Sequence, residues 1–298
     1  MKKIIDILIE KIKENGNPTV MGLDPRYEML PQCVTEKYPQ TLEGVAEAII
    51  EYNKTLIDAV YDIIPAVKPQ IAFYEMFGIP GMRAFEETCK YAKEKGVILM
   101  EAYAYLHSPY VKSLQEDVKS GIIGEVDYIE SAFLTQGYEE DIRLYKEMGG
   151  GAMYDLGCYC TTMMLSLTDA TPVFVKADAE MSDKGVDTFT AGILKFDNGI
   201  RASFNVGMML GFKGARYDRL YIHGSEGVII SEVEYNQAGE YRYRIIKDGE
   251  ETERKGFAPQ NYSLEVQQLC NAIMGYESAY IAPEFSIRNA ELIDKVLI

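Results

Sequence analysis

The positions of the apolar residues divide the chain into two parts with different periodicities. In the first hundred residues, stretches with apolar side chains at helical spacing alternate with short apolar runs. The helical stretches are residues 4–12, 42–64 and 81–95, and the apolar runs are residues 18–23, 66–72 and 97–100. Thr41 precedes the second helical stretch, where an N-cap would stand. This order predicts right-handed βαβ units, so residues 1–100 are expected to form a truncated α/β domain of three βα units around a parallel sheet.

After residue 100 the pattern changes to longer segments in which apolar and polar residues alternate. The predicted strands are residues 124–135, 173–181, 188–196, 200–208, 219–230 and 241–247. Helices are predicted at residues 109–120, from the glycine run at 149–151 to residue 167, and at 263–274 and 286–297. Residues 101–298 are therefore expected to form an α+β domain with a large, mostly antiparallel open sheet.

Composition and charge exclude several classes of partner. The 298 residues can form two domains, and 30 basic against 46 acidic side chains give a net charge of −16. Such a chain repels phosphate backbones and anionic lipids, so neither nucleic acid nor a membrane is an expected partner. No apolar run has the length of a membrane span and the start lacks a signal-peptide pattern, which indicates a cytoplasmic protein. With 2 histidines, no metal site is expected.

Two charged side chains in the first part lie where the chemistry of a βα protein is usually found. Asp24 and Lys68 come at or just after the ends of predicted strands. A lysine and an aspartate in this position can hold a phosphorylated sugar through a charge and hydroxyl hydrogen bonds. The alternative is structural: Asp24 begins an Asp-Pro turn and Lys68 extends into solvent.

A glycine run in the second part leads into a helix that carries an acid and a phenol. Gly150 and Gly151 would let the backbone approach a ligand, and N–H groups at a helix start attract oxygen atoms. Asp155 and Tyr159 are four residues apart and share one helical face. Tyr159 could act as a general acid toward a carbonyl, with Asp155 binding a sugar hydroxyl. The alternative is a core helix with a glycine hinge and a buried tyrosine.

Three motifs in the first part closely resemble the opening of bacterial orotidine 5′-monophosphate decarboxylases. They are residues 17–26 (NPTVMGLDPR), 50–54 (IEYNK) and 66–75 (AVKPQIAFYE), and the resemblance covers about residues 1–98. It implies part of a (βα)8 TIM barrel that works without a cofactor, with Asp24 binding the ribose and Lys68 in the catalytic charge network. The family's Asp-x-Lys motif is missing, because Ala102 and Ala104 occupy its positions and His107 lies near that of its last aspartate.

From about residue 90 to the C-terminus the chain resembles the C-terminal domain of the Gfo/Idh/MocA oxidoreductases, in their dihydrodiol dehydrogenase-like branch. The motifs are residues 101–109 (EAYAYLHSP), 120–126 (SGIIGEV), 149–159 (GGGAMYDLGCY), 196–199 (FDNG) and 224–227 (GSEG). The resemblance implies NAD or NADP as cofactor, a small-molecule substrate such as a sugar, and a homodimer or higher oligomer formed through the sheet. It makes Tyr159 the proton donor and places Asp155, Tyr105 and His107 in the substrate pocket.

The dinucleotide fingerprint of that family, Gly-x-Gly-x-x-Gly between a first strand and helix, is absent, since Gly22 stands alone after the first strand. We therefore interpret the chain as a chimera joined within residues 90–101, whose first sheet is a partial barrel or Rossmann-like. The main hypothesis is a Gfo/Idh/MocA-like oxidoreductase that lacks its own dinucleotide motif. One alternative is a decarboxylase-like protein that binds a phosphorylated nucleoside without a cofactor. Another is a non-catalytic dimerisation or binding module.

Overall fold

The computed structural model describes residues 19–64, 66–95, 100–139, 141–210, 216–273 and 276–297. Its contacts divide the chain into two compact units. Unit 1 comprises Met1–Tyr103 and Glu265–Ala290, and unit 2 comprises Ala104–Leu264 and Glu291–Ile298. The helix predicted at residues 4–12 and most of the strand predicted at 97–100 lie outside the described residues.

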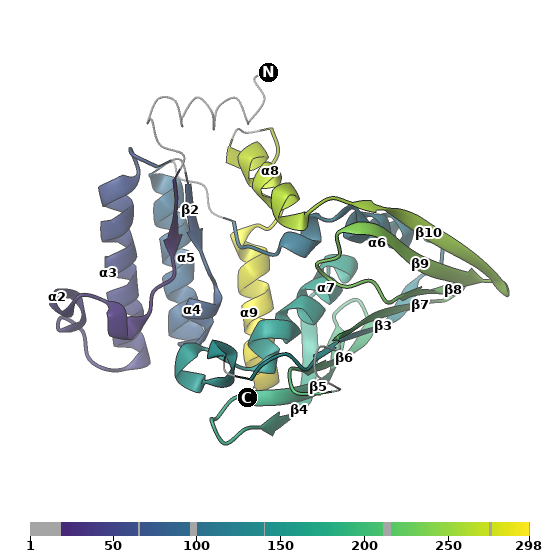
Figure 1. Cartoon of the computed structure of the whole chain (residues 1–298), viewed down its shortest axis with the longest axis horizontal. Coiled ribbons are helices and arrows are strands. Elements are labelled where there is room, and N and C mark those ends of the chain that lie inside the picture. Colours follow the sequence, from purple (N-terminus) through teal and green to yellow (C-terminus); the bar gives the residue numbers. More distant parts are fainter. Residues whose placement is uncertain are drawn as a thin grey trace. The chain divides into compact units, whose positions relative to one another are not determined.

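Unit 1 contains two parallel strands and several helices (Figure 1). In chain order these are β1 (Val20–Leu23), a 3-10 turn (Tyr27–Met29), α2 (Gln32–Thr35), α3 (Leu42–Val60), β2 (Ala66–Pro69), α4 (Ala72–Glu75) and α5 (Gly78–Glu94). The strands pair from Val20 opposite Ala66 to Leu23 opposite Pro69. The unit boundaries pass within the two C-terminal helices, α8 (Asn261–Ile273) and α9 (Pro283–Leu297).

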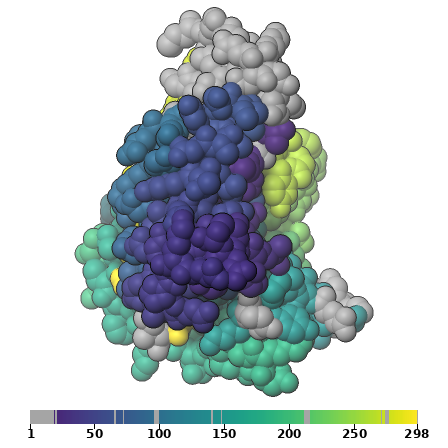
Figure 2. Space-filling view, turned by 90° about the vertical axis from the view of Figure 1, so that its left-hand side faces the viewer, coloured from purple at the N-terminus to yellow at the C-terminus, as the bar shows by residue number. Residues whose placement is uncertain are grey.

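The core of unit 1 lies where α3 packs on α5. Ile49 and Phe85 are fully buried, and the Phe85 ring meets Tyr74 edge to face at 5.3 Å. The Tyr74 hydroxyl donates to the Leu23 carbonyl at the end of β1, and the Asn53 amide donates to Tyr74. This polar chain fixes the strand end against the helices. The outer surface of α2 and α3 faces the viewer, in purple and blue, in Figure 2.

The predicted N-cap of α3 is present, because the Thr41 hydroxyl oxygen accepts a hydrogen bond from the Gly44 N–H at 3.2 Å. Thr41→Ala is expected to lower the free energy of unfolding by about 1 kcal/mol, since one N–H of the first turn loses its acceptor. Urea unfolding at neutral pH measures the change. Thr55→Ala is the matched control, because Thr55 is exposed in the middle of the same helix and bonds only to the Glu51 carbonyl. Equal losses from both variants would contradict the cap.

Unit 2 is built on an eight-stranded sheet in the order β10-β9-β8-β7-β3-β6-β5-β4. Its strands are β3 (Val126–Thr135), β4 (Pro172–Met181), β5 (Asp187–Phe196), β6 (Arg201–Gly207), β7 (Arg216–Gly224), β8 (Gly227–Ser231), β9 (Gly239–Lys247) and β10 (Glu250–Ala258). Only β3 and β6 pair in parallel among these strands, so the prediction of a large, mostly antiparallel sheet is confirmed.

Two strand predictions in this sheet were wrong. The single strand predicted at residues 219–230 is the hairpin of β7 and β8, because the chain turns at Ser225 and Glu226, whose N–H groups donate to the carbonyls of Glu125 and Ile123. β10 was not predicted at all. Its sequence EETERKGFA is charged because it is an edge strand, and charged edges are common in sheets.

The helices of unit 2 lie on one face of the sheet (Figure 1). They are a short 3-10 helix (Ala104–His107), α6 (Pro109–Lys119), and a π-helical turn (Met153–Gly157) that continues into α7 (Cys158–Thr168). The other face carries exposed apolar side chains such as Phe174 and Ile193, around a hollow of about 630 Å³ that Tyr128 and His223 also line. The homodimer expected through this sheet stays a prediction.

Candidate functional site

Tyr159 lies in the first turn of α7, inside a group of four aromatic rings that we call the aromatic cluster. The cluster is Tyr105, Phe133, Tyr159 and Tyr235, with the Tyr159 ring centroid 5.2, 5.6 and 5.5 Å from those of Tyr105, Phe133 and Tyr235. Helix α7 supplies Tyr159, and the underlying strand β3 supplies Phe133. The phenol is thus held by rings on several sides, which fixes its direction.

Among the described residues, the hydroxyl of Tyr159 has one hydrogen-bond partner, the side-chain amide of Asn236, whose nitrogen lies 3.5 Å away. Burial raises the pKa of the Tyr159 phenol, and the hydrogen bond from Asn236 acts in the opposite direction. The phenol is therefore protonated at neutral pH and can donate its proton. This protonation state suits a general acid toward a carbonyl oxygen.

Tyr105 and His107 both lie in the short 3-10 helix and are buried. The Tyr105 hydroxyl is paired with Thr162 at 2.7 Å and with the Tyr159 carbonyl at 3.1 Å, so it anchors α7. Burial, with the charge of Lys112, lowers the pKa of His107 to about 4, so its ring is neutral at pH 7. The structure places Tyr105 against Tyr159, as the sequence suggested, and a direct substrate contact by either residue stays a prediction.

Asp155 lies in the π-helical turn, four residues before Tyr159, and its carboxylate has two partners in unit 2. Arg143 donates through Nε at 2.6 Å, and the Tyr138 hydroxyl donates to the other oxygen. Arg143 also binds Asp141 at 3.0 Å. The carboxylate is therefore oriented by two donors while its side chain stays 20% exposed, which leaves it reachable by a ligand.

Gly150 and Gly151 have a packing role that the sequence did not reveal. A Cβ on Gly150 would lie 2.3 Å from the Arg143 carbonyl oxygen, and one on Gly151, at φ +133°, would lie 2.3 Å from the Asp187 carboxylate. Asp187 accepts the Met153 N–H at 2.9 Å. The Asp187 carboxylate therefore already accepts one of the N–H groups at the start of this helix. A substrate contact by the two glycines stays a prediction.

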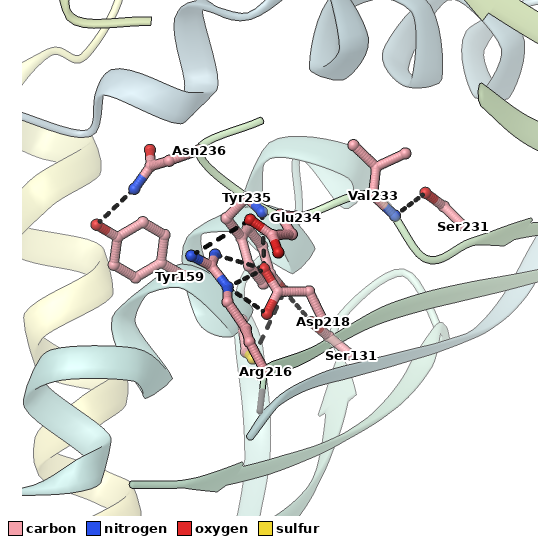
Figure 3. Close-up of polar contacts among 10 residues, drawn as sticks. Ser131, Tyr159, Arg216, Asp218, Ser231, Val233, Glu234, Tyr235 and Asn236 are labelled. Atoms are coloured by element: carbon pink, nitrogen blue, oxygen red, sulfur yellow. Dashed lines mark hydrogen bonds and ion pairs between the residues drawn. The ribbon is translucent and has the colours of Figure 1, made fainter. Parts of the chain in front are cut away.

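Sequence reasoning missed an ion pair between an exposed arginine and a buried aspartate beside the aromatic cluster, shown in Figure 3. Arg216 binds Asp218 through two nitrogens at 2.9 and 2.6 Å, and its guanidinium lies 4.5 Å from the Phe133 ring centroid. Asp218 also accepts the backbone N–H of Tyr235 at 2.8 Å. The spacing of Arg216 and Asp218 was a usable signal, since residues two apart on a strand share a face.

In unit 1, Lys68 and Asp24 lie together at the C-terminal ends of the two parallel strands. The Lys68 ammonium is 3.5 Å from the Asp24 carboxylate, which also accepts the Gln70 N–H at 3.0 Å. Both side chains are more than a third exposed, so the pair adds little stability but remains accessible to a ligand. Both residues lie at strand ends, and their binding of a phosphorylated sugar stays a prediction.

The described residues after β1 do not fit the pyrophosphate of a dinucleotide. A Rossmann turn offers glycines and free N–H groups there, whereas this chain continues with Asp24, a carboxylate, and Pro25, which has no N–H. The following helical turn, Tyr27–Met29, has only 3 residues, and its N-cap Arg26 makes no side-chain capping bond. The carboxylate would repel a phosphate at this position.

Comparison with known proteins assigns the two parts of the chain to different groups. Residues 111–230 match the family model of the GFO/IDH/MocA C-terminal domain. Over 98 residues the chain is 39% identical to the orotidine 5′-phosphate decarboxylase of Clostridium novyi, and over 90 residues it is 37% identical to that of Rhodopirellula baltica. These matches fall in the N-terminal third and cover 33% and 30% of the chain, so the chain spans about a third of the length of these relatives, 32% and 30%.

Solved structures show the fold of the whole chain. KijD10, a 3-ketoreductase from Actinomadura kijaniata in complex with NADP and TDP-benzene, superimposes with a TM-score of 0.70 at 19% identity, over 94% of this chain and 97% of that one. An aldose-aldose oxidoreductase from Caulobacter crescentus gives 0.69 at 16% identity, over 93% and 95%.

These solved structures share with this chain a fold with a large mixed sheet and helices. Residues 111–230 match the model of the GFO/IDH/MocA C-terminal domain, and the N-terminal third is similar to orotidine 5′-phosphate decarboxylase. Both resemblances predicted from the motifs are confirmed. Among the described residues, no helix has the length and apolar character needed to cross a membrane.

Proposed function

We propose that unit 2 is the substrate-binding domain of an oxidoreductase acting on a hydroxyl or carbonyl group of a sugar or related polyol. The observation that carries the proposal is the Tyr159 phenol, which is protonated, held by the aromatic cluster and located one helical turn from Asp155. In this arrangement Tyr159 holds a proton for a substrate oxygen. Asp155, oriented by Arg143 and Tyr138, accepts a hydrogen bond from a neighbouring substrate hydroxyl.

The charges around these side chains favour an uncharged substrate. Arg143 is matched by Asp141 and Asp155, and Arg216 is matched by Asp218 and Glu234. Among the described residues, each of these two arginines thus faces two carboxylates, so neither arginine has positive charge in excess for a phosphate or carboxylate group. Aromatic rings such as those of the aromatic cluster pack well against the apolar face of a sugar ring.

NADP is bound by the similar 3-ketoreductase, and in this chain the residues after β1 do not fit a dinucleotide. A bound nicotinamide would supply the hydride in such an enzyme. We therefore expect unit 2 to bind its polyol and expect the isolated chain to show no measurable affinity for NAD(P)(H). A chain that binds a polyol but not NAD(P)(H) would be a substrate-binding domain that carries no nicotinamide cofactor of its own.

The proposal predicts that neutral sugars bind to the chain and that Tyr159→Phe with Asp155→Ala lowers the affinity at least tenfold, because the phenol donor and the carboxylate acceptor are both removed. Saturation-transfer NMR with a panel of neutral aldoses and ketoses measures binding. Tyr128→Phe, on the far face of the sheet, is the matched control and should bind like the parent. No saturation transfer to any sugar, or equal affinity in all variants, would contradict the proposal.

A second candidate function rests on the pair of Lys68 and Asp24 at the two strand ends of unit 1. This pair could bind a phosphorylated nucleoside, with Asp24 on its ribose as the decarboxylase resemblance implies, and without decarboxylation because Ala102 and Ala104 carry no acid or ammonium group. Uridine monophosphate is therefore included in the NMR panel. Saturation transfer to it that is lost in Lys68→Ala would favour this second function.

A further inference from the structure

The loop between β8 and β9 carries a side chain that the proposed function does not yet use. Asn236 lies in this loop, and its amide nitrogen reaches the Tyr159 hydroxyl from a position 77 residues further along the chain (Figure 3). At 3.5 Å the contact is long for a hydrogen bond. Such contacts at proton-donating groups commonly shorten when substrate binds.

The loop is fixed on both sides of Asn236. On one side the Tyr235 N–H is bound by the buried carboxylate of Asp218, and the Tyr235 ring stacks on Phe133 with 5.3 Å between centroids. On the other side the Gln237 N–H donates to the Glu234 carbonyl at 2.9 Å and closes the turn. The direction of the Asn236 side chain is therefore set before any ligand arrives, as a binding group requires.

One atom of Asn236 is left without a partner. Its carbonyl oxygen Oδ1 is buried and accepts no hydrogen bond from any described residue. Buried carbonyl oxygens in folded proteins are nearly always paired, so an orphan acceptor beside a reactive hydroxyl indicates a place for a donor. Because Oδ1 belongs to the same amide group as the Nδ2 that contacts the Tyr159 hydroxyl, a ligand that bonds to both Oδ1 and Tyr159 needs two oxygen atoms on nearby carbons.

We propose that Asn236 positions the Tyr159 hydroxyl through its amide nitrogen and accepts, through Oδ1, a hydrogen bond from the hydroxyl next to the reacting oxygen of the substrate. The substrate class is thereby narrowed to vicinal diols and α-hydroxycarbonyl compounds. This inference rests on the proposed function of unit 2. It adds a specificity-determining residue to that site and gives Asn236 a role beyond packing.

The experiment places 3,5-difluorotyrosine, which is more acidic than tyrosine, at position 159 of the full chain and follows its ¹⁹F signal. Asn236→Leu removes the amide donor and should raise the apparent pKa of this phenol, so that its acid dissociation constant falls at least threefold. Asn236→Asp places a carboxylate beside the phenol and should raise the pKa further. Gln237→Leu is the matched control, because this neighbouring amide contacts only the Ala238 and Glu240 carbonyls.

The same signal is titrated with glycerol, a vicinal triol, and with 1,3-propanediol, which lacks the middle hydroxyl. We expect glycerol to bind at least fivefold more tightly in the parent, and the preference to disappear in Asn236→Leu. An unchanged pKa together with an unchanged preference in Asn236→Leu overturns the inference and leaves the proposed function intact. If neither glycerol nor 1,3-propanediol perturbs the parent signal, the acceptor role fails, and the sugar panel decides the proposed function separately.

Discussion

Replacing Arg216 by methionine is expected to lower the free energy of unfolding by about 3 kcal/mol at neutral pH, because it leaves the buried Asp218 carboxylate without a positively charged partner. Asp218 is 1% exposed, and Arg216, which donates three hydrogen bonds to it, is its only positive partner among the described residues. Burial already raises the pKa of Asp218, and Arg216 opposes that rise. Without Arg216 the carboxyl group must either remain charged in an apolar site or take up a proton.

Two comparisons separate this mechanism from simple loss of packing. Adding Asp218→Asn should restore most of the lost stability, since asparagine carries no charge and still accepts the Tyr235 N–H. Lowering the pH should also reduce the deficit, because protonation removes the stranded charge. Arg242→Met is the matched control: Arg242 is 72% exposed, lies 3.8 Å from Glu253 and should change stability little. Urea unfolding measures all four proteins, and a deficit that persists in the double variant would contradict the explanation.

Elements with a strong local signal could be predicted from the sequence. Helix α3 is set by its apolar spacing and by Thr41, whose cap the structure contains, although the helix ends at Val60 rather than Ile64. The existence of strands β3 to β6 along the chain followed from alternation, and the hairpin between β5 and β6 followed from the turn signal at 197–199. In each of these cases the residues that decide the structure lie within a few positions of each other.

The parts that could not be predicted depend on contacts between distant residues. β10 is stable because it pairs with β9 from Lys247 to Gly239, and its charged sequence gives no apolar alternation. The glycines of the 149–151 run were interpreted through ligand binding, but Asp187, which occupies the space beside Gly151, lies far along the chain.

The residues of the candidate site likewise include some that could be predicted from local sequence and some that could not. Tyr159 and Asp155 were predicted as neighbours because helical periodicity places them there. Asn236 and the Arg216–Asp218 pair approach Tyr159 only through the pairing of β3 with β7 and of β7 with β8, which no local pattern encodes. The residues that share a helical face can be predicted from their spacing. The loop that brings Asn236 to that face can be placed only when the order of the strands in the sheet is known.

The second large effect is expected at Glu101 in unit 1, as a loss of stability with rising pH. Burial raises the pKa of Glu101 to about 8, an effect that nearby Ser286 and Tyr103 oppose and the charge of Glu265 adds to. Between these two pKa values the folded chain therefore keeps a proton on Glu101 that the unfolded chain has released. The contribution of protonated Glu101 to the free energy of unfolding is fully present below the unfolded pKa of 4.5 and is lost as the pH rises through 8. Between about pH 5 and pH 8 this lowers the free energy of unfolding by on the order of 3 to 4 kcal/mol.

Glu101→Gln tests this effect because the amide keeps the shape of the protonated acid and does not ionise. Its free energy of unfolding, measured in urea across this pH range, should fall less steeply than that of the parent, and the two proteins should differ most near pH 8. Burial also raises the pKa of Glu265, to about 7, while Lys68 opposes the rise, so some slope should remain in the variant. Glu94→Gln, at an exposed position near the end of α5, should keep the parent slope. Parallel curves for parent and Glu101→Gln would show that Glu101 is ionised in the folded chain, and the buried-acid explanation would then be wrong.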